Sequence, residues 1–576
     1  MKARTVAVRP TLAAVVGAEA VALAAFTALP PGYAGWWPAA VITAVAIIAL
    51  VVTVHRRNAA TWVAARARWL RARRTAVPTA AAVDIAQGSI VCGVRTDTHE
   101  AITMIRVAGR PDSPTFLRTS SVSKTANLLP LDVLIGLLDQ PGDLHLGIDV
   151  VSAGHRVRRG TGYPALYSTL LADRPAAGQR STRLVVRLDI PESVAGLAYR
   201  RSIGSAAAAA TERIINALFQ VGVRASALGA ADLDAALAEL GAGLAAPPPP
   251  QPLTDDEPID DGEALDRSDA LVTAGAGRAV PADRAKRVRT PSDVGWRAID
   301  AHPGHLSSYY FSPEDITTAA LHQMWALRTD HVVQTLALRK QPHSAPDGGE
   351  QVTVSALVRT NDPQRPQQPP TLFLNPLPGD QYAASLWAAP IARPRLALPT
   401  RVLDRPGELE IPVGSTGILV GAAVHDDPTV RPRIHRDDLV MWPVTDPQRA
   451  TRIAMDTSEF YMRQLLIRAA ATGEQIAIYS HDPGRWAQLE QPNIAVVQRN
   501  RPAEFVPTVI VNDRPVSAPS TGLSSTVITL GKVDPRGPEP DVWFEQTSRS
   551  TVRIIAGDQV VEVAMVVFRQ EQAFTG

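Results

Sequence analysis

Residues 11–29 (TLAAVVGAEAVALAAFTAL) and 39–54 (AAVITAVAIIALVVTV) are two long apolar stretches near the start of this 576-residue chain. At about 1.5 Å per residue, a helix over the first stretch approaches the roughly 30 Å hydrocarbon core of a bilayer. The second stretch is slightly shorter, and the uncharged, turn-forming residues 30–35 (PPGYAG) separate the two. The sequence therefore predicts a two-helix transmembrane hairpin over residues 11–57.

The residues that flank the two spans predict their orientation. Trp36 and Trp37 precede the second span and Arg56 and Arg57 follow it, which is the arrangement of aromatic and basic anchors at the two surfaces of a bilayer. Basic residues occur within the first ten residues and again after the second span, so both ends are expected in the cytoplasm. We predict a multi-pass protein of the inner membrane whose N-terminus (residues 1–10) and bulk are cytoplasmic. A cleaved signal peptide is the rival interpretation of the first span.

A basic helix is expected to leave the membrane over residues 58–80. Trp62, Arg66 and Trp69 recur at helical spacing, and further arginines follow them. Such a helix places its arginines at phospholipid headgroups. The alternative is a basic helix that is simply solvated.

Glu19 is the one ionisable residue deep in the first apolar span. A carboxyl group in hydrocarbon is either protonated or faces a polar partner, because its charged form costs several kcal/mol there. The small residues Ala14, Ala18, Ala22 and Ala25 form a groove that lets another helix approach closely. We expect this face to pack against the second span or a neighbouring subunit, with Glu19 in a hydrogen bond. The alternative is a protonated Glu19 that is merely tolerated.

Composition limits the function of the remaining chain. Hydrophobic residues make up 45% and charged residues 20%, which is enough for a folded core. The net charge of +2 argues against a general nucleic-acid binder. The single cysteine, Cys92, forms no intramolecular disulfide and is consistent with a reducing cytosol.

The cytosolic part divides by its pattern into three segments. Residues 81–242 alternate between expected strands and helices, including one long helix over 195–220, and therefore predict an α/β region. Residues 243–290 are rich in proline, acidic residues, alanine and glycine, which predicts a disordered linker between domains or an insertion within one. Residues 291–576 return to a mixed pattern, with a helix expected over 313–327 and an antiparallel β-meander over 526–568.

Four features carry a resemblance to a known family. They are the N-terminal hairpin with its basic exit, TWVAA at residues 61–65 leading to WLRARR at 69–74, DVVSAGHRV at 149–157 and IPVGSTGILVG at 411–421. In this order and spacing, the chain resembles EccE, a membrane component of the actinobacterial type VII (ESX) secretion system. The long acidic and proline-rich segment and the extended C-terminus depart from shorter members of the family.

The resemblance implies a subunit of an inner-membrane complex with EccB, EccC and EccD as its neighbours. It also implies a cytosolic region that is similar to a degenerate glycosyltransferase-like fold and has no known activity or cofactor.

The candidate motifs for catalysis and phosphate binding each lack residues that the motif requires. Gly531-Lys532 lacks the first glycine and the hydroxyl residue of a P-loop, and His99-Glu100 lacks the second histidine of a zinc protease. The glycines of residues 414–421 lack a lysine and are typical of a tight turn between strands. No nucleophile elbow occurs.

Two weaker chemical candidates remain. Asp232 and Asp234 have the spacing of metal-binding carboxylates in glycosyltransferases, but they lie at the expected start of a helix, where acidic residues favour the dipole. His302 and His305 flank a Pro-Gly turn and lack further ligands for a metal.

Three functions compete: a structural secretion subunit, a membrane-tethered glycosyltransferase-like enzyme, and a membrane-bound partner-binding or signalling protein. The failed motifs disfavour the enzyme, and the resemblance favours the first over the third. We therefore predict a non-catalytic subunit that supports protein export and has no metal or cofactor.

Overall fold

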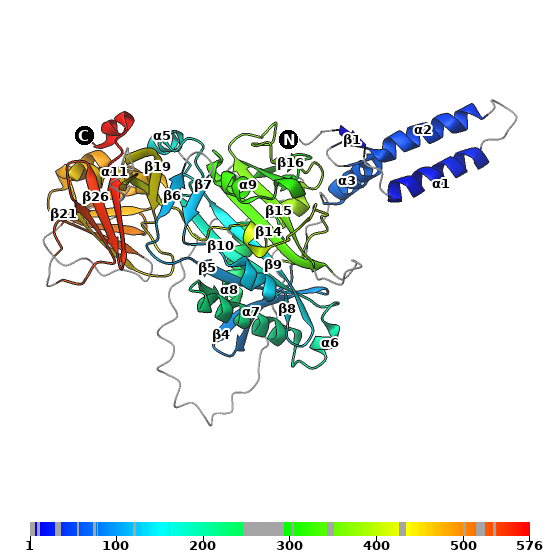
Figure 1. Ribbon diagram of the computed structural model, residues 1–576, viewed down its shortest axis with the longest axis horizontal. Coiled ribbons are helices and arrows are strands. Elements are labelled where there is room, and N and C mark those ends of the chain that lie inside the picture. Colours follow the sequence, from blue (N-terminus) through cyan, green and yellow to red (C-terminus); the bar gives the residue numbers. More distant parts are fainter. Residues whose placement is uncertain are drawn as a thin grey trace, which may run out of the picture.

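The computed structural model describes residues 6–8, 12–28, 36–54, 57–72, 77, 79–118, 122–159, 162–245, 293–301, 304–341, 351–424, 434–498, 503–513, 525–533 and 537–575. Two large β-sheets form the body, and a helical hairpin projects from one end of it (Figure 1). The C-terminal part of the described chain lies at the opposite end (Figure 1). The expected turn at 30–35, Arg56 and most of the expected linker at 243–290 lie outside the described residues.

The N-terminal hairpin consists of α1 (Leu12–Ala28) and α2 (Trp37–Val51), which lie side by side (Figure 1). The short strands β1 (Val6–Val8) and β2 (Val52–Val54) pair antiparallel at its base. The chain thus enters and leaves the hairpin at the same end, and helices occupy both predicted segments. Within the part of the chain that the structure describes, no helix has the length and apolar character that crossing a membrane requires.

The first sheet runs in the order β12-β13-β15-β14-β9-β10-β5-β4-β3 along its main path. Strands β9 and β14 are direct antiparallel neighbours, although one precedes and the other follows residues 246–292 in the sequence. Strands from residues 81–242 and from residues 291–576 therefore belong to one sheet. Its strands are β3 (Ala82–Gln87), β4 (Ile90–Thr96), β5 (Glu100–Ala108), β8 (Asp139–Gln140), β9 (Leu144–His155), β10 (Gln179–Asp189), β11 (Arg224–Ala227), β12 (Ile299–Ala301), β13 (Gly304–Phe311), β14 (His331–Gln341), β15 (Gln351–Asp362), β16 (Leu374–Pro376) and β17 (Arg401–Val402).

Two helices cover opposite faces of the first sheet, as the alternation along β5 shows. Ala101 and Ile105 belong to the core under α7 (Ile203–Gln220), whereas Ile102 and Met104 belong to the core under α8 (Ala230–Leu240). Successive strand residues point to opposite faces. A strand buried on both sides therefore needs apolar residues on both faces, and β5 carries them in a mainly apolar run that Thr103 and Arg106 interrupt.

The second sheet joins six parallel strands, ordered β22-β21-β23-β24-β20-β25, to an antiparallel part formed by β26, β27, β18, β19, β6 and β7. The early strands β6 and β7 thus complete a sheet made mainly from the end of the chain. Its strands are β6 (Thr115–Arg118), β7 (Val122–Thr125), β18 (Ile418–Val424), β19 (Ile434–Trp442), β20 (Thr451–Asp456), β21 (Ile476–Ser480), β22 (Ile494–Val497), β23 (Val509–Asp513), β24 (Thr526–Leu530), β25 (Val542–Gln546), β26 (Thr551–Ala556) and β27 (Gln559–Ala564).

The expected antiparallel meander over 526–568 is wrong at its first step. Strands β24 and β25 do not pair with each other, because β20 lies between them and pairs parallel with both. Only β25, β26 and β27 form an antiparallel series.

Two expected helices are broken by local caps. The helix expected over 195–220 divides into α6 (Val194–Leu197) and α7, because the Ser202 and Ser205 side chains form a capping box that starts a new helix. The helix expected over 313–327 divides into η2 (Pro313–Asp315), α9 (Thr318–Gln323) and η3 (Met324–Ala326), and the Thr317 hydroxyl accepts a hydrogen bond from the Ala320 amide at the start of α9. The remaining helices are α3 (Ala59–Ala72), α4 (Leu131–Gly136), α5 (Tyr163–Leu170), α10 (Gln381–Ser385), η4 (Pro406–Glu408), α11 (Glu459–Ala471), η5 (Pro483–Leu489), η6 (Arg569–Glu571) and α12 (Gln572–Thr575).

The architecture is therefore mixed α/β with two large sheets. Likeness to a glycosyltransferase fold stays a prediction.

Candidate functional site at the base of the hairpin

Helix α3 joins the hairpin to the body of the molecule (Figure 1). It begins after Asn58, whose side-chain oxygen accepts a hydrogen bond from the Thr61 amide at 2.9 Å. Such a side-chain acceptor satisfies one of the free amides at a helix N-terminus. The Asn58 side-chain amide also donates to the Leu50 carbonyl of α2 at 3.0 Å. One residue thus caps α3 and ties it to the end of the hairpin.

Two arginines at α3 converge on Asp380, which is more than 300 residues away in the sequence. Arg57 donates to Asp380 Oδ2 at 2.6 Å and to the Pro378 carbonyl at 2.7 Å. Arg68 donates through Nε to Asp380 Oδ1 at 3.0 Å. Asp380 is 3% exposed, Arg57 15% and Arg68 47%. The Arg57 pair is therefore the more strongly shielded from water and the stronger of the two.

Three tryptophans form the apolar part of the same contact. Trp69 packs edge-on against Trp296, with ring centroids 5.6 Å apart, and its indole N–H donates to the Val294 carbonyl at 3.1 Å. The ring centroid of Trp62 lies 6.2 Å from that of Trp296, with the two rings tilted by 32°. The Arg66 guanidinium stacks 4.3 Å from the centroid of Trp69, a cation–π distance.

A glycine lets the two parts of the site approach each other. Gly379 has a φ of +83° and lies against the Trp296 ring, where an added Cβ would stand 2.6 Å from a ring carbon. Its amide donates to the Trp296 carbonyl at 2.7 Å. Any side chain here would displace the indole that α3 packs on, and the left-handed backbone also favours glycine.

The residues predicted at the membrane interface divide between two places. Trp69 is buried, Trp62 is half-buried, and Arg57 is paired with Asp380, so all three make contacts within the protein. The Trp69 ring is enclosed by residues near 294–306 and 382–391. Arg66 remains exposed above the tryptophans.

In the hairpin, the predicted alanine groove faces α2. Ala14 and Ala18 are 3% and 7% exposed, and Ala22 is half-buried. Glu19 is exposed and lies outside this contact. Trp36 and Trp37, at the far end of the hairpin, are 75% and 60% exposed.

Sequence reasoning missed Asp380, Gly379 and Trp296. The Pro378-Gly379-Asp380 run indicates a turn, but no local pattern relates a turn to arginines more than 300 residues earlier. Asp380 directly precedes the mainly apolar stretch at 381–389, and this placement was the available signal that the carboxylate is buried with a cationic partner.

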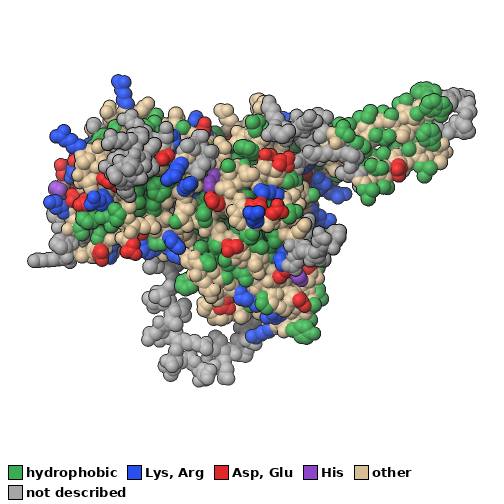
Figure 2. All heavy atoms as spheres, in the orientation of Figure 1, with side chains coloured by type: hydrophobic (Ala, Val, Ile, Leu, Met, Phe, Trp, Pro, Cys, Tyr) green, Lys and Arg blue, Asp and Glu red, His purple; other side chains and the backbone are tan. Residues whose placement is uncertain are grey.

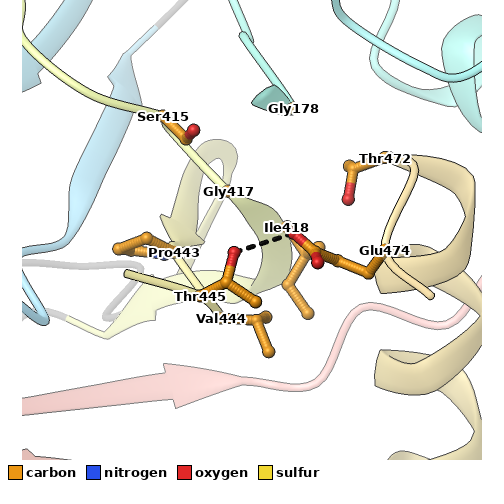
Figure 3. Close-up of a pocket in the computed structure, with 9 residues that line it drawn as sticks. All are labelled: Gly178, Ser415, Gly417, Ile418, Pro443, Val444, Thr445, Thr472 and Glu474. Atoms are coloured by element: carbon orange, nitrogen blue, oxygen red, sulfur yellow. Dashed lines mark hydrogen bonds between the residues drawn. The ribbon is translucent and has the colours of Figure 1, made fainter. Parts of the chain in front are cut away.

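The glycine-rich turn at 414–417 lies at the seam between the two sheets (Figure 3). The Thr416 hydroxyl donates to the Ala177 carbonyl at 2.7 Å, and Gly417 packs directly on the backbone of Trp442. The adjacent hollow has a volume of about 10 Å³ and contains Glu474, whose carboxylate accepts a hydrogen bond from Thr445 at 2.8 Å (Figure 3). A ligand pocket usually needs roughly 300–1,000 Å³, and a carboxylate repels phosphate. The turn therefore connects the sheets.

The described members of the carboxylate pair and the histidine pair take part in helix and ion-pair contacts within the fold. Asp232 lies in the first turn of α8, and Asp234 pairs with the buried Arg95. His305 contacts Asp300 at 2.9 Å across the β12–β13 hairpin, while His302 is outside the described residues. Among the residues whose structure is described, no group of three His, Cys, Asp or Glu side chains is placed to hold a metal ion.

Comparison with known proteins gives a family match over part of the chain and relatives that align with most of it. The family model described as "Putative type VII ESX secretion system translocon, EccE" matches residues 176–309. The ESX-2 secretion system protein EccE2 of Mycobacterium tuberculosis is 27% identical over 505 residues, which cover 84% of this chain and 82% of the relative. The ESX-5 protein EccE5 of the same species is 27% identical and covers 66% of this chain, with 87% of its own length aligned. The ESX-1 protein EccE1 is 26% identical, with 77% of both chains covered.

Proposed function

We propose that this chain, an EccE-family component of a type VII secretion system, is a non-catalytic structural subunit held in the inner membrane by its α1–α2 hairpin. Other ESX membrane components, namely EccB, EccC and EccD, are its proposed partners. The chain supports protein export by fixing its two-sheet body at the membrane surface.

The apolar surface of the hairpin carries this proposal. Hydrophobic side chains cover its visible face (Figure 2). Large side chains are exposed along both helices: Leu12, Val15, Val16, Val21, Leu23 and Phe26 on α1, and Val41, Ile42, Val45, Ile47 and Ile48 on α2. Exposure of a continuous apolar surface to water is unfavourable by about 25 cal/mol per Å². A lipid environment removes that cost.

The geometry of the hairpin suits insertion from one side. The 17 residues of α1 rise about 25 Å, short of the roughly 30 Å of an unperturbed hydrocarbon core, so the proposed insertion requires local thinning of the bilayer. The exposed Trp36 and Trp37 are at the far end, where an aromatic belt is expected at the opposite surface. The β1–β2 pair keeps the two hairpin ends together on the side of the body.

The site at α3 connects the proposed membrane anchor firmly to the body. The Asp380 ion pairs and the Trp62–Trp296–Trp69 cluster hold α3 against the body directly beside the hairpin. A force or rotation applied to the body is therefore passed to the hairpin through packed side chains and ion pairs. A scaffold subunit of a membrane complex requires this rigidity.

Alkaline carbonate extraction of native membranes tests the anchor, with two matched valines as the perturbation. Val45 on α2 and Val560 on β27 are each 59% exposed. An arginine inside the bilayer costs about 2.5–3.5 kcal/mol on insertion scales. We expect the unmodified chain to stay in the membrane pellet, Val45→Arg to raise the extracted fraction, and Val560→Arg to behave as the unmodified chain. Release of the unmodified chain by carbonate would refute the membrane anchor.

The structural role is tested by copurification. We expect a tagged full-length chain to recover the other ESX membrane components from native membranes solubilised in mild detergent. Recovery of the chain alone, under conditions that keep those components together, would contradict the proposal.

A further inference from the structure

Helix α1 has two faces of different character. The small residues Ala14, Ala18 and Ala25, which are 3%, 7% and 8% exposed, lie against α2. A second stripe consists of Leu12, Val16, Glu19, Leu23 and Phe26, and all of its members are exposed. We call these five residues the outer stripe.

The outer stripe has the spacing of a helix–helix seam. Its members follow one another at intervals of four, three, four and three residues. This spacing keeps side chains on one line along a helix and is the repeat by which two helices pack side by side. The large members are 83%, 55%, 70% and 52% exposed, so α2 leaves this line uncovered.

Glu19 stands at the centre of the outer stripe. A carboxyl group within a bilayer is costly unless it meets a hydrogen-bond donor, and intramembrane ionisable residues accordingly face a partner. In helix pairs, a single polar residue in an apolar seam selects the partner and its register.

Among the described residues of the hairpin, none donates a hydrogen bond to Glu19. Apart from Glu19, α1 and α2 contain no ionisable side chain. The hydroxyls of Thr27 and Thr43 donate to carbonyls of their own helices, at 2.8 Å to Leu23 and 2.8 Å to Ala39. A second copy of this chain, packed through the same stripe, would bring a like charge opposite Glu19.

We propose that the outer stripe binds one transmembrane helix of a different membrane subunit, and that this helix places a cationic side chain against Glu19. Complementary charge selects this occupant over a second copy. The inference rests on the proposed insertion of the hairpin into the membrane. Beyond that insertion, the inference specifies which face of α1 contacts the partner and that the partner contributes a cationic side chain.

Site-specific photocross-linking in the full-length chain locates the contact. A benzophenone amino acid replaces Val16 on the outer stripe or Ala24, which is also exposed but lies at least about 80° around the helix from every member of the stripe. We expect a cross-link from position 16, and not from position 24, to an apolar segment of another protein that contains Arg, Lys or His. A cross-linked product of two copies of this chain, equal cross-linking from both positions, or no protein cross-link from position 16 would overturn the proposal.

Substitution of Glu19 tests the ion pair itself. Glu19→Leu should lower recovery of the cross-linked subunit in native gels roughly 3- to 30-fold, the range expected for the loss of one interhelical polar contact. Glu19→Gln should lower recovery less, because its amide still accepts a hydrogen bond, and the control Ala24→Leu, off the stripe, should leave recovery unchanged. Replacement of the partner's cationic residue by Leu should cause no further loss in the Glu19→Leu background. Unchanged recovery of Glu19→Leu, or additive losses in the double variant, would refute the pairing.

Carbonate extraction of the same samples distinguishes failure of the proposed membrane anchor from failure of the proposed helix contact. If the unmodified chain is extracted, the proposed membrane anchor fails. If the chain stays in the membrane but position 16 meets lipid only, the anchor holds and the partner face is wrong.

Discussion

Asp380 controls how firmly α3 is held to the body, and its charge can be removed with little change of shape by Asp380→Asn. The carboxylate accepts hydrogen bonds from Arg57 at 2.6 Å and from Arg68 at 3.0 and 3.2 Å. In the variant, both guanidinium groups lose their common counter-charge. The expected result is local release of α3 from the body.

The burial of the three charged groups sets the size of the expected loss in the docking free energy of α3. Breaking a fully buried ion pair costs about 3–5 kcal/mol, whereas an exposed pair contributes about 0–1 kcal/mol. Asp380 is 3% and Arg57 15% exposed, but Arg68 is 47% exposed and keeps its hydration. We therefore expect a loss of about 2–3 kcal/mol, between these limits, in the docking free energy of α3. This loss corresponds to a roughly 30- to 150-fold increase in the opening equilibrium.

Hydrogen exchange of the full-length protein in lipid nanodiscs measures that opening. Amides of α3 should exchange faster by the same factor, while amides of β14 at the centre of the first sheet should be unaffected. Asp300→Asn is the matched control, because Asp300 also accepts two hydrogen bonds from one arginine, Arg365, but is 55% exposed. Unchanged exchange of α3 in Asp380→Asn, or equal acceleration in both variants, would refute this account of the site.

Three further perturbations have defined outcomes. Gly379→Ala should loosen α3 in the same exchange experiment because its Cβ would meet an indole ring, whereas Gly407→Ala, which has open space around it, should not. Glu571→Gln should lower the free energy of unfolding by about 3–5 kcal/mol, seen as a lower thermal midpoint, because the fully buried Arg468 loses its counter-charge; an unchanged midpoint would contradict this. Burial lowers the pKa of His322 from 6.5 to about 4, so its neutral form stabilises the fold and stability should be lost as the pH falls through that interval. His322→Gln should flatten this part of the pH profile, and an identical profile would show that His322 does not contribute.

Local patterns determined much of the secondary structure. Helix α1 lies within the apolar run at 11–29 that predicted it, and α2 covers most of the run at 39–54. These features depend on side-chain periodicity and caps within a few residues, which a sequence displays directly. The same locality explains the errors at 195–220 and 313–327, where caps within an apolar run begin new helices.

Sequence reasoning established only part of the candidate site. It placed Trp62, Arg66 and Trp69 on one helix and identified the basic exit from the hairpin. It did not identify their partners Trp296 and Asp380, which lie more than 200 residues later and have no spacing that relates them to α3. The cavity next to the glycine-rich turn likewise depends on Glu474, which comes from another part of the chain.

The sequence by itself determined which segments are apolar, where most helices and strands begin, and that the motifs of phosphate and zinc chemistry are incomplete. Only the tertiary structure decided that β14 pairs with β9 across residues 246–292, that β20 separates β24 from β25, and that two arginines meet at Asp380. The physical reason is that strand order and ion pairing are set by contacts between distant segments. Their free energy comes from burying surface and charge together once the chain has folded, and no local pattern records it.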